Sequence, residues 1–218
     1  MGRPQPFSDA YATDMEEIGL FPLATVLLPT EEIQLHIFEP RYRELIGECL
    51  EQETEFGLVY SDDDGIQEIG TRAGVVRAER LPDGRLNVVA RGGERFRLLE
   101  LTDGRSFHTG RVEPLEDQAD PAPAGDVTRA LQLFERVVEI TGAATDPPDP
   151  DQPLLSFDLA GRFDLAPGLK QSLLVQTSER ERLARVCEIL EGAAAAAARL
   201  RELHALAQRN GHPRPPDS

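Results

Sequence analysis

The chain has 218 residues, and 39 acidic against 23 basic side chains give it a formal net charge of -16. Negative charge of this size repels phosphate backbones and anionic lipid headgroups, so we expect neither a nucleic acid nor a membrane as partner. With 40% hydrophobic residues, the composition is that of a globular protein. No apolar run reaches the roughly 20 residues of a membrane span.

The N-terminal residues 1–14 carry proline, serine, aspartate and glycine without periodicity, and we predict a flexible arm there. They are acidic and lack the apolar centre of a secretory signal. Cys49 and Cys187 each lie on the apolar face of a predicted helix, where a reduced thiol packs as a small hydrophobe. No disulfide framework is indicated, and we expect a cytoplasmic location.

Strand-like segments, separated by glycine, proline and aspartate turns, dominate the chain from Gly19 to Asp117. LPDGRL (81–86) predicts a hairpin turn, because Asp-Gly supplies a positive φ. DDDG (62–65) predicts a solvated turn, and GGERF (92–96) predicts a bulge or tight turn. Seven strands with such turns predict a closed or half-closed barrel. The seven segments are 19–28, 32–38, 55–61, 73–81, 85–92, 94–101 and 106–115.

One helix interrupts these strands. Pro40 suits its first position, because the missing N–H of proline costs nothing there. An apolar stripe follows at helical spacing, and the opposite face is charged. The stripe consists of Tyr42, Leu45, Ile46, Cys49 and Leu50.

The composition changes after residue 117 to an acidic stretch rich in proline and alanine, which is typical of a linker. Asp126 is the predicted N-cap of the next helix, and Gly142 is placed to end it. Pro167 opens another helix, and Ser178 with Glu181 predicts a capping box before a long last helix. The predicted organisation is a flexible arm (1–14), a barrel subdomain (15–117), a linker (118–125), a helical subdomain (126–210) and a flexible tail (211–218).

Motifs for catalysis or metal binding are not found. Lys170 is the only lysine, and no phosphate-binding loop precedes it. Ser172 lies two residues further along a predicted helix, so the two side chains face different ways and do not predict a catalytic pair. The histidines lack the paired spacing of zinc ligands, so we expect no metal and no cofactor. They are His36, His108, His204 and His212.

Three segments together resemble the N-terminal substrate-binding domain of Lon proteases. They are FPLATVLLPTEEIQLHIFEPRYRELIGECL (21–50), AERLPDGRLNVVARGGERFRLLEL (78–101) and VEPLED (112–117), and the phrase HIFEPRYR is nearly diagnostic. GLKQSLLVQTSERERLARVCEIL (168–190) also resembles the helical half of that domain. The resemblance covers roughly residues 18–195, and it departs at Thr30, where family members commonly have glycine.

The resemblance implies an α+β fold, in which a PUA-like β pseudo-barrel with one inserted helix is followed by a helical bundle ending in a long C-terminal helix. It also implies contact with protein substrates. The ATPase and protease modules of a full Lon are not recognised in this sequence, so we expect a stand-alone bacterial member of the family that is not an enzyme.

The corner where the second strand meets the helix is the candidate site. One interpretation is structural: Pro40 begins the helix, and Glu39 with Arg41 or Arg43 ties the corner by charge-assisted hydrogen bonds. The other is functional: aromatic and arginine side chains, common at binding hot spots, border a groove for extended polypeptide. An exposed barrel edge would add main-chain pairing. The peptide-binding candidates are His36, Phe38, Arg41 and Tyr42.

The leading functional hypothesis is a non-enzymatic module that binds unfolded or extended polypeptide, as an adaptor or regulator for a separate protease. The alternative is an RNA-binding PUA-like protein, because arginines concentrate in the predicted barrel, although the net charge argues against it. A hydrolase is the weakest hypothesis. The long C-terminal helix, with its run of alanines from Ala193 to Ala198, suggests a homodimer.

Overall fold

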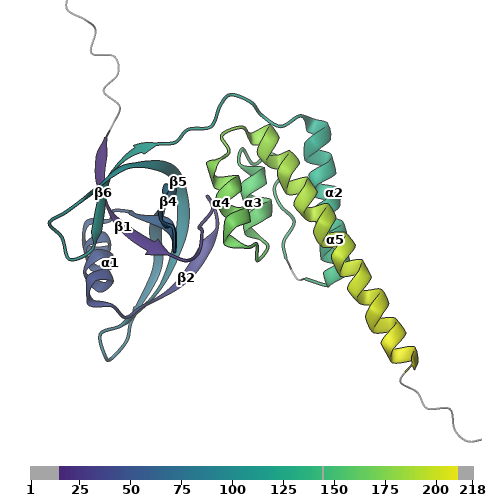
Figure 1. Ribbon diagram of the computed structural model, residues 1–218, viewed down its shortest axis with the longest axis horizontal. Coiled ribbons are helices and arrows are strands. Elements are labelled where there is room, and N and C mark those ends of the chain that lie inside the picture. The colour runs from purple at the N-terminus through teal and green to yellow at the C-terminus, as the bar shows by residue number, and fades with distance from the viewer. Residues whose placement is uncertain (1–14, 144, 211–218) are drawn as a thin grey trace, which may run out of the picture. The chain divides into compact units, whose positions relative to one another are not determined.

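The computed structural model describes residues 15–143 and 145–210, which form two compact units (Figure 1). The first unit contains the chain up to Glu116 together with Ala166–Val175, and the second contains Asp117–Leu165 and the chain from Gln176 onward. The predicted arm (1–14) and tail (211–218) lie outside the described residues. The linker at 118–125 stays a prediction.

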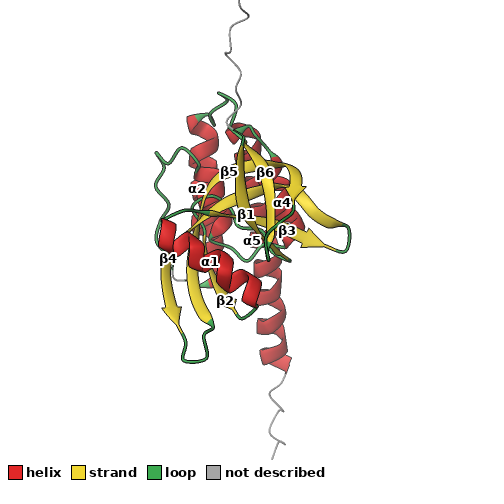
Figure 2. Ribbon diagram, turned by 90° about the vertical axis from the view of Figure 1, so that its left-hand side faces the viewer, coloured by secondary structure: helices red, strands yellow, loops and turns green. Residues whose placement is uncertain are grey.

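The first unit is built on one mixed sheet with the strand order β2-β5-β4-β3-β1-β6 (Figure 2). The first and third strands are parallel, and the other pairs are antiparallel. Strand β5 also pairs with β6, so five strands close into a ring and β2 stands outside it. The strands are β1 (Glu16–Leu23), β2 (Glu32–Ile37), β3 (Phe56–Asp62), β4 (Gly65–Arg80), β5 (Leu86–Thr102) and β6 (His108–Pro114).

Strand β5 serves two partners in succession on the same side. Its first half pairs with β2 from Leu86 to Arg91, and its second half pairs with β6 from Phe96 to Thr102. Between the halves the register with β4 shifts, since Thr71 faces Arg95 whereas Ala73 faces Gly92. The extra residue on β5 is a bulge, which bends the strand and lets it change partner.

Helix α1 (Pro40–Gln52) packs its apolar face against the barrel. Tyr42, Leu45, Ile46 and Cys49 are buried there in one core cluster with residues of the strands. Leu50, the fifth member of the predicted stripe, is 41% exposed. The prediction for Leu50 was wrong, because in the last turn of this helix only Cys49 faces the core.

The predicted turns of the barrel are present, but the strand bounds differ: β1 ends at Leu23 instead of residue 28, and β4 begins at Gly65 instead of residue 73. Hairpin turns lie at DDDG and LPDG, where Gly65 and Gly84 have φ of 113° and 84°. GGERF forms the bulge. The described residues contain six strands instead of seven, because the predicted segments 85–92 and 94–101 are one continuous strand across that bulge.

Helix α4 (Pro167–Val175) belongs to the barrel unit, although it follows the second unit's helices in sequence. The ammonium group of Lys170 donates to the Glu31 carboxylate, and both side chains are largely buried. Gln171 donates to the carbonyl oxygen of Ile69 at 3.1 Å, and Arg95 donates to that of Leu174 at 2.7 Å. These polar bonds attach α4 to strands β4 and β5 and to the turn before β2.

The second unit consists of α2 (Ala124–Thr141), α3 (Leu155–Gly161) and α5 (Glu179–Asn210). Helices α2 and α5 lie side by side (Figure 1), and they run parallel, since Arg129 pairs with Glu191 at 2.6 Å and Arg201 donates to the Glu139 carbonyl at 3.4 Å. Gly142, with a φ of 71°, ends α2 as predicted.

Two predicted helix caps differ in the structure. The N-cap of α2 is Pro123, not Asp126, since the extended backbone of Pro123 leads straight into the helix and leaves Asp126 in the first turn, where a carboxylate favours the helix dipole. Half of the predicted capping box forms, because the Glu181 N–H donates to the Ser178 hydroxyl at 3.1 Å. The Glu181 carboxylate instead accepts from Gln176.

Thr30 lies in a tight turn and has a φ of 72°, in the left-handed region. Its N–H donates to the Gly92 carbonyl at 2.8 Å, and the Gly92 N–H donates to the Glu31 carbonyl at 2.9 Å, so the turn is held against β5. A residue with a β-carbon is strained in this conformation by about 1 to 2 kcal/mol. The turn therefore requires a positive φ at residue 30, which glycine adopts without strain.

We predict that Thr30→Gly stabilises the barrel by about 1 kcal/mol, because it removes this strain. Urea unfolding followed by circular dichroism measures the change. Thr30→Ala is the matched control, since alanine keeps the β-carbon and gains little. A Gly variant no more stable than the Ala variant would contradict the strained turn.

Candidate functional site

The corner between β2 and α1 is formed by four consecutive residues. Ile37 is buried at the end of the strand, and Phe38 beside it is 62% exposed. The backbone of Glu39 is still extended, with a ψ of 133°, and Pro40 begins the helix. Because α1 starts without a side-chain cap, the proline and the extended residue before it fix where the strand ends and the helix begins.

The aromatic floor of the corner is made by Tyr42 and Phe21, whose rings stack at 4.1 Å between centroids. Tyr42 is only 6% exposed. The Arg41 guanidinium lies 4.5 Å above the Tyr42 ring and also pairs with Glu39 at 2.9 Å. Burial raises the pKa of Tyr42, against the opposing effect of Arg41, so the phenol stays neutral.

His36 lies on the exposed face of β2, opposite Asn87 of β5. One ring nitrogen is 2.8 Å from the Asn87 amide oxygen, and the other is 3.2 Å from an Arg85 guanidinium nitrogen. The His36 and Phe38 rings are 6.4 Å apart and nearly parallel. His36 is therefore held in place by neighbours on the β4–β5 hairpin.

A groove of about 340 Å³ joins these residues. One wall comes from β2 and the corner, with Gln34, Leu35, His36, Ile37, Phe38 and Glu39 in sequence, and the floor includes Arg41 and Tyr42. The other wall is the end of β1, with Phe21, Pro22 and Leu23. A second, larger hollow of about 720 Å³ lies over the outer face of the β2, β5 and β4 strands and shares Gln34, Leu35 and His36 with the groove.

The structure brings the four peptide-binding candidates together around one groove. Of the residues predicted to hold the corner, Glu39, Pro40 and Arg43, Pro40 begins α1 and Glu39 accepts from Arg41 at 2.9 Å. Arg43 does not pair with Glu39 and instead donates to the Gly84 carbonyl at 3.3 Å. Sequence reasoning missed the β1 wall, because Phe21 was predicted only as part of the strand 19–28. Its signal was Pro22, since proline is placed where a strand has a free edge.

Four of the barrel arginines are paired with carboxylates. Arg72 pairs with Glu16 at 2.9 Å, Arg85 with Asp83 at 2.6 Å and Arg97 with Glu113 at 3.4 Å. Arg91 pairs with Glu32. A phosphate backbone would have to displace these carboxylates, so the alternative of RNA binding is not favoured.

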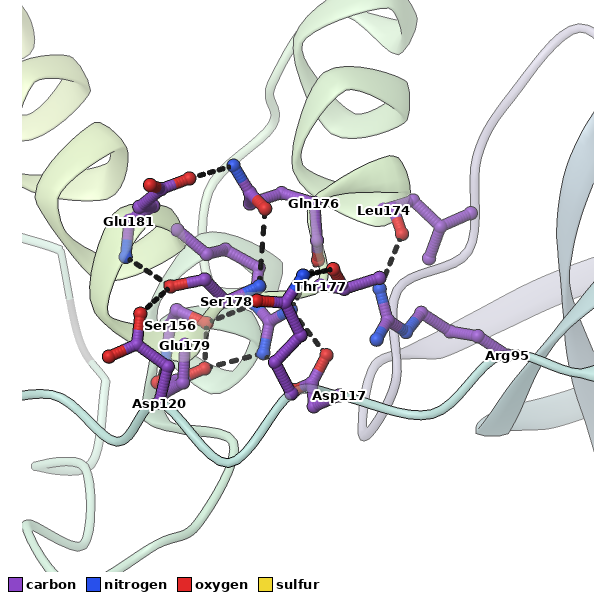
Figure 3. Close-up of polar contacts among 12 residues, drawn as sticks. Arg95, Asp117, Asp120, Ser156, Leu174, Gln176, Thr177, Ser178, Glu179 and Glu181 are labelled. Carbon is purple, nitrogen blue, oxygen red and sulfur yellow. Dashed lines mark hydrogen bonds and ion pairs between the residues drawn. The ribbon is translucent and has the colours of Figure 1, made fainter.

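A second polar cluster lies in the helical unit around Arg182, whose side chain is fully buried. Its guanidinium pairs with Asp117 and Glu179, each at 2.6 Å, and stacks on the Phe157 ring at 3.9 Å. Figure 3 shows Ser156 and Glu179 meeting there, and the Ser156 hydroxyl donates to the Glu179 carboxylate at 2.7 Å. We name these residues, Arg182, Asp117, Glu179 and Ser156, the Arg182 cluster.

The Arg182 cluster has a nucleophile-like serine, but its bonding is structural. The Ser156 hydroxyl also accepts from Arg182 at 2.7 Å, so a cation and a carboxylate fix it from both sides. Ser156, Arg182 and Glu179 are all buried, so a substrate has no approach. Likewise, Lys170 is bonded to Glu31 while the Ser172 hydroxyl donates to the Leu169 carbonyl, so these two do not act as a pair.

Three further observations concern metal binding, membrane-spanning helices and the cysteines. No group of metal-ligating side chains is found in residues 15–143 and 145–203. Within the same ranges, no helix has both the length and the apolar character needed to cross a bilayer. Cys49 and Cys187 are free and buried, and burial raises the pKa of both thiols. These are packing residues, as the sequence predicted.

The fold is that of an α+β domain built on a six-stranded sheet that closes into a partial ring. The family model described as the ATP-dependent protease La (LON) substrate-binding domain matches residues 17–192. The chain therefore belongs to the family of LON substrate-binding domains, and the α+β fold expected from the resemblance is confirmed.

Curated relatives and solved structures agree with this assignment. The Lon protease of Paraburkholderia phytofirmans is 29% identical over 81% of this chain, and that of Parabacteroides distasonis is 25% identical over 66%. The chain spans only 24% and 19% of their lengths. The crystal structure of a Lon N-terminal domain protein from Xanthomonas campestris superposes with a TM-score of 0.65 and 28% identity, covering 78% of this chain and 96% of that one. The N-terminal domain of a Mycobacterium avium complex Lon protease shares the fold, with a TM-score of 0.58 and 16% identity over 83% of this chain and 98% of that one.

Asp120 offers a test of how the helical unit is held together. Its carboxylate accepts from Arg180 at 3.0 Å and from the Ser178 hydroxyl at 2.7 Å (Figure 3 labels Asp120 and Ser178). These hydrogen bonds, with that of Arg180 the largest cause, hold the pKa of Asp120 below its ordinary 3.8. A carboxyl whose pKa is lower in the folded state stabilises the fold above its unfolded pKa, and the stabilisation disappears as pH falls through the folded pKa.

We therefore predict that Asp120→Asn is less stable than the parent at pH 7 and that the difference narrows as pH falls below about 4. Urea midpoints measured between pH 7 and pH 3 give the comparison. Asp63→Asn, in the exposed β3–β4 turn, removes the same charge and should change stability at pH 7 by less than about 0.5 kcal/mol. A gap for Asp120→Asn that is independent of pH would rule out this linkage.

Proposed function

We propose that this chain is a polypeptide-binding module that recognises unfolded or extended segments of other proteins in the groove between β2 and the end of β1. The observation that carries the proposal is the groove itself, which runs beside β2 over an aromatic floor. Membership of the LON substrate-binding family supports it, since the family description names substrate binding.

The chemistry of the groove suits an apolar side chain on a polypeptide. The apolar lining of the groove consists of Phe21, Leu35, Ile37 and Tyr42, which are nearly buried. Phe38 stands exposed at the rim, so its side chain contributes little to folding and can be buried when a polypeptide binds. Aromatic residues that are accessible in the free protein are typical hot spots of interfaces. Burial of an apolar side chain contributes about 1.5 to 3 kcal/mol, so one anchored residue supports weak, reversible binding.

The finer proposal is that the module acts without catalysis, as an adaptor or regulator of a separate protease in the cytoplasm. The groove contains no nucleophile next to a base among its lining residues, which fits binding better than chemistry. Leu200 and Leu203 are exposed one turn apart on α5, which suits pairing with a second copy through this helix.

We predict that a fluorescein-labelled, permanently unfolded protein, such as reduced and carboxymethylated lactalbumin, binds saturably and that Phe38→Ala weakens this binding at least about five-fold. Fluorescence anisotropy gives the dissociation constants. Phe38 is suited to the test because its exposed side chain contributes little to folding, whereas truncating the buried Tyr42 would cost about 3 to 5 kcal/mol of stability.

Leu101→Ala is the matched control, because Leu101 is a 52% exposed apolar residue of β5 that does not line the groove. Its dissociation constant should stay at the parent value. Absence of binding at about 100 μM, or equal weakening by both substitutions, would reject this site.

A further inference from the structure

Strand β2 is paired along only one of its two edges. All six of its residues pair with β5, from Glu32 opposite Arg91 to Ile37 opposite Leu86. Among the described residues, no strand pairs with its other edge, since β2 is the end of the strand order. A free edge presents main-chain N–H and C=O groups at regular spacing, which is a template for another extended chain.

The groove lies along this free edge, not over one face of the strand. The groove is lined by Gln34 to Ile37 of β2 on one side and by Phe21 to Leu23 of β1 on the other. Strands β1 and β2 do not pair with each other. The groove therefore lies between the unpaired edge of β2 and the end of β1, where an extended chain can reach the backbone of β2.

The facing wall supplies apolar surface more than hydrogen bonds. Three successive residues at the end of β1 line it, and the middle one, Pro22, has no N–H to donate. On their other side these residues pair with β3, from Phe21 opposite Leu58 to Leu23 opposite Tyr60. An incoming chain therefore finds hydrogen-bonding partners on β2 and packing partners on β1.

The charges around the groove select a neutral segment. The nearest full charges, on Glu39 and Arg41, neutralise each other at 2.9 Å. On one face of β2 the buried Leu35 and Ile37 lie toward the aromatic floor, while Gln34 and His36 are exposed on the opposite face. An added strand would thus place alternate side chains on an apolar and on a polar surface.

We infer that the polypeptide binds as an additional strand on the free edge of β2, with an aromatic or branched apolar side chain seated on Tyr42 and Phe21. The inference rests on the proposed function and specifies how binding occurs: main-chain pairing gives affinity for any extended segment, and the aromatic floor selects segments with apolar residues at alternate positions. Charged or proline-rich segments are poor ligands, because they lack the pocket residue or the N–H groups.

A methylation scan of a synthetic peptide tests this mode. The probe is a short fluorescein-labelled peptide in which threonine and valine alternate around a central phenylalanine, and each backbone nitrogen is methylated in turn. In an added strand, every second N–H points to β2 and the others point away. Methylation should therefore weaken binding about ten-fold or more at alternate positions and leave it nearly unchanged between them.

Each outcome decides the inference separately from the proposed function. Alternating sensitivity, together with weaker binding after the central phenylalanine is replaced by alanine, supports strand addition. Equal sensitivity at all positions, or no binding of this peptide while the unfolded protein binds with its Phe38 dependence, overturns strand addition and leaves the proposed function standing. If neither probe binds at about 100 μM, both proposals fall.

Discussion

The close contact between Gly92 and the turn that precedes β2 is the constraint on which the barrel unit depends. A β-carbon at Gly92 would lie 2.2 Å from the carbonyl oxygen of Leu28, closer than any real contact. Glycine there admits the turn, whose N–H and C=O groups bond to Gly92 in both directions. The turn then delivers the chain to β2, and the bulge next to Gly92 lets β5 leave β2 and join β6. Without this contact, β2 would have neither its partner nor its position outside the ring.

The groove is a consequence of that partner change. Because β5 leaves β2 for β6, the five-stranded ring closes through β1 and β6, and the other edge of β2, outside the ring, stays unpaired beside the end of β1. Tyr42, Leu45 and Ile46 of helix α1 pack into the core next to this edge, with Leu35 and Ile37 of β2. What is left is a narrow space beside a free strand edge, with Tyr42 as its floor. The same tyrosine thus stabilises the core and forms the binding surface, which joins the structural and functional interpretations of HIFEPRYR.

The sequence predicts the features that depend on neighbours in the chain. Pro40, Gly84 and Gly142 restrict or free the backbone locally, so the helix start, the hairpin turn and the helix end follow from them. It does not predict contacts between distant residues. The pairing of Lys170 with Glu31, 139 residues apart, places α4 in the barrel unit, although its apolar pattern showed only that it is a helix. Arg182 is similar: it looked like one charge among many on α5, and its buried pairing with Asp117 lies 65 residues away. The candidate site was predicted on the β2 side, where the residues are consecutive, and missed on the β1 side, where only the fold brings Phe21 to Tyr42.

The most direct measurement of the central claim is amide hydrogen exchange of the chain with and without saturating unfolded protein. Free-edge amides exchange readily, and pairing with an added strand slows them. The account predicts slower exchange upon binding at alternate amides between Gln34 and Ile37, those that point away from β5, with α2 and the first turns of α5 unchanged. Slowing confined to the helical unit, with β2 unaffected, would contradict a binding site at this edge.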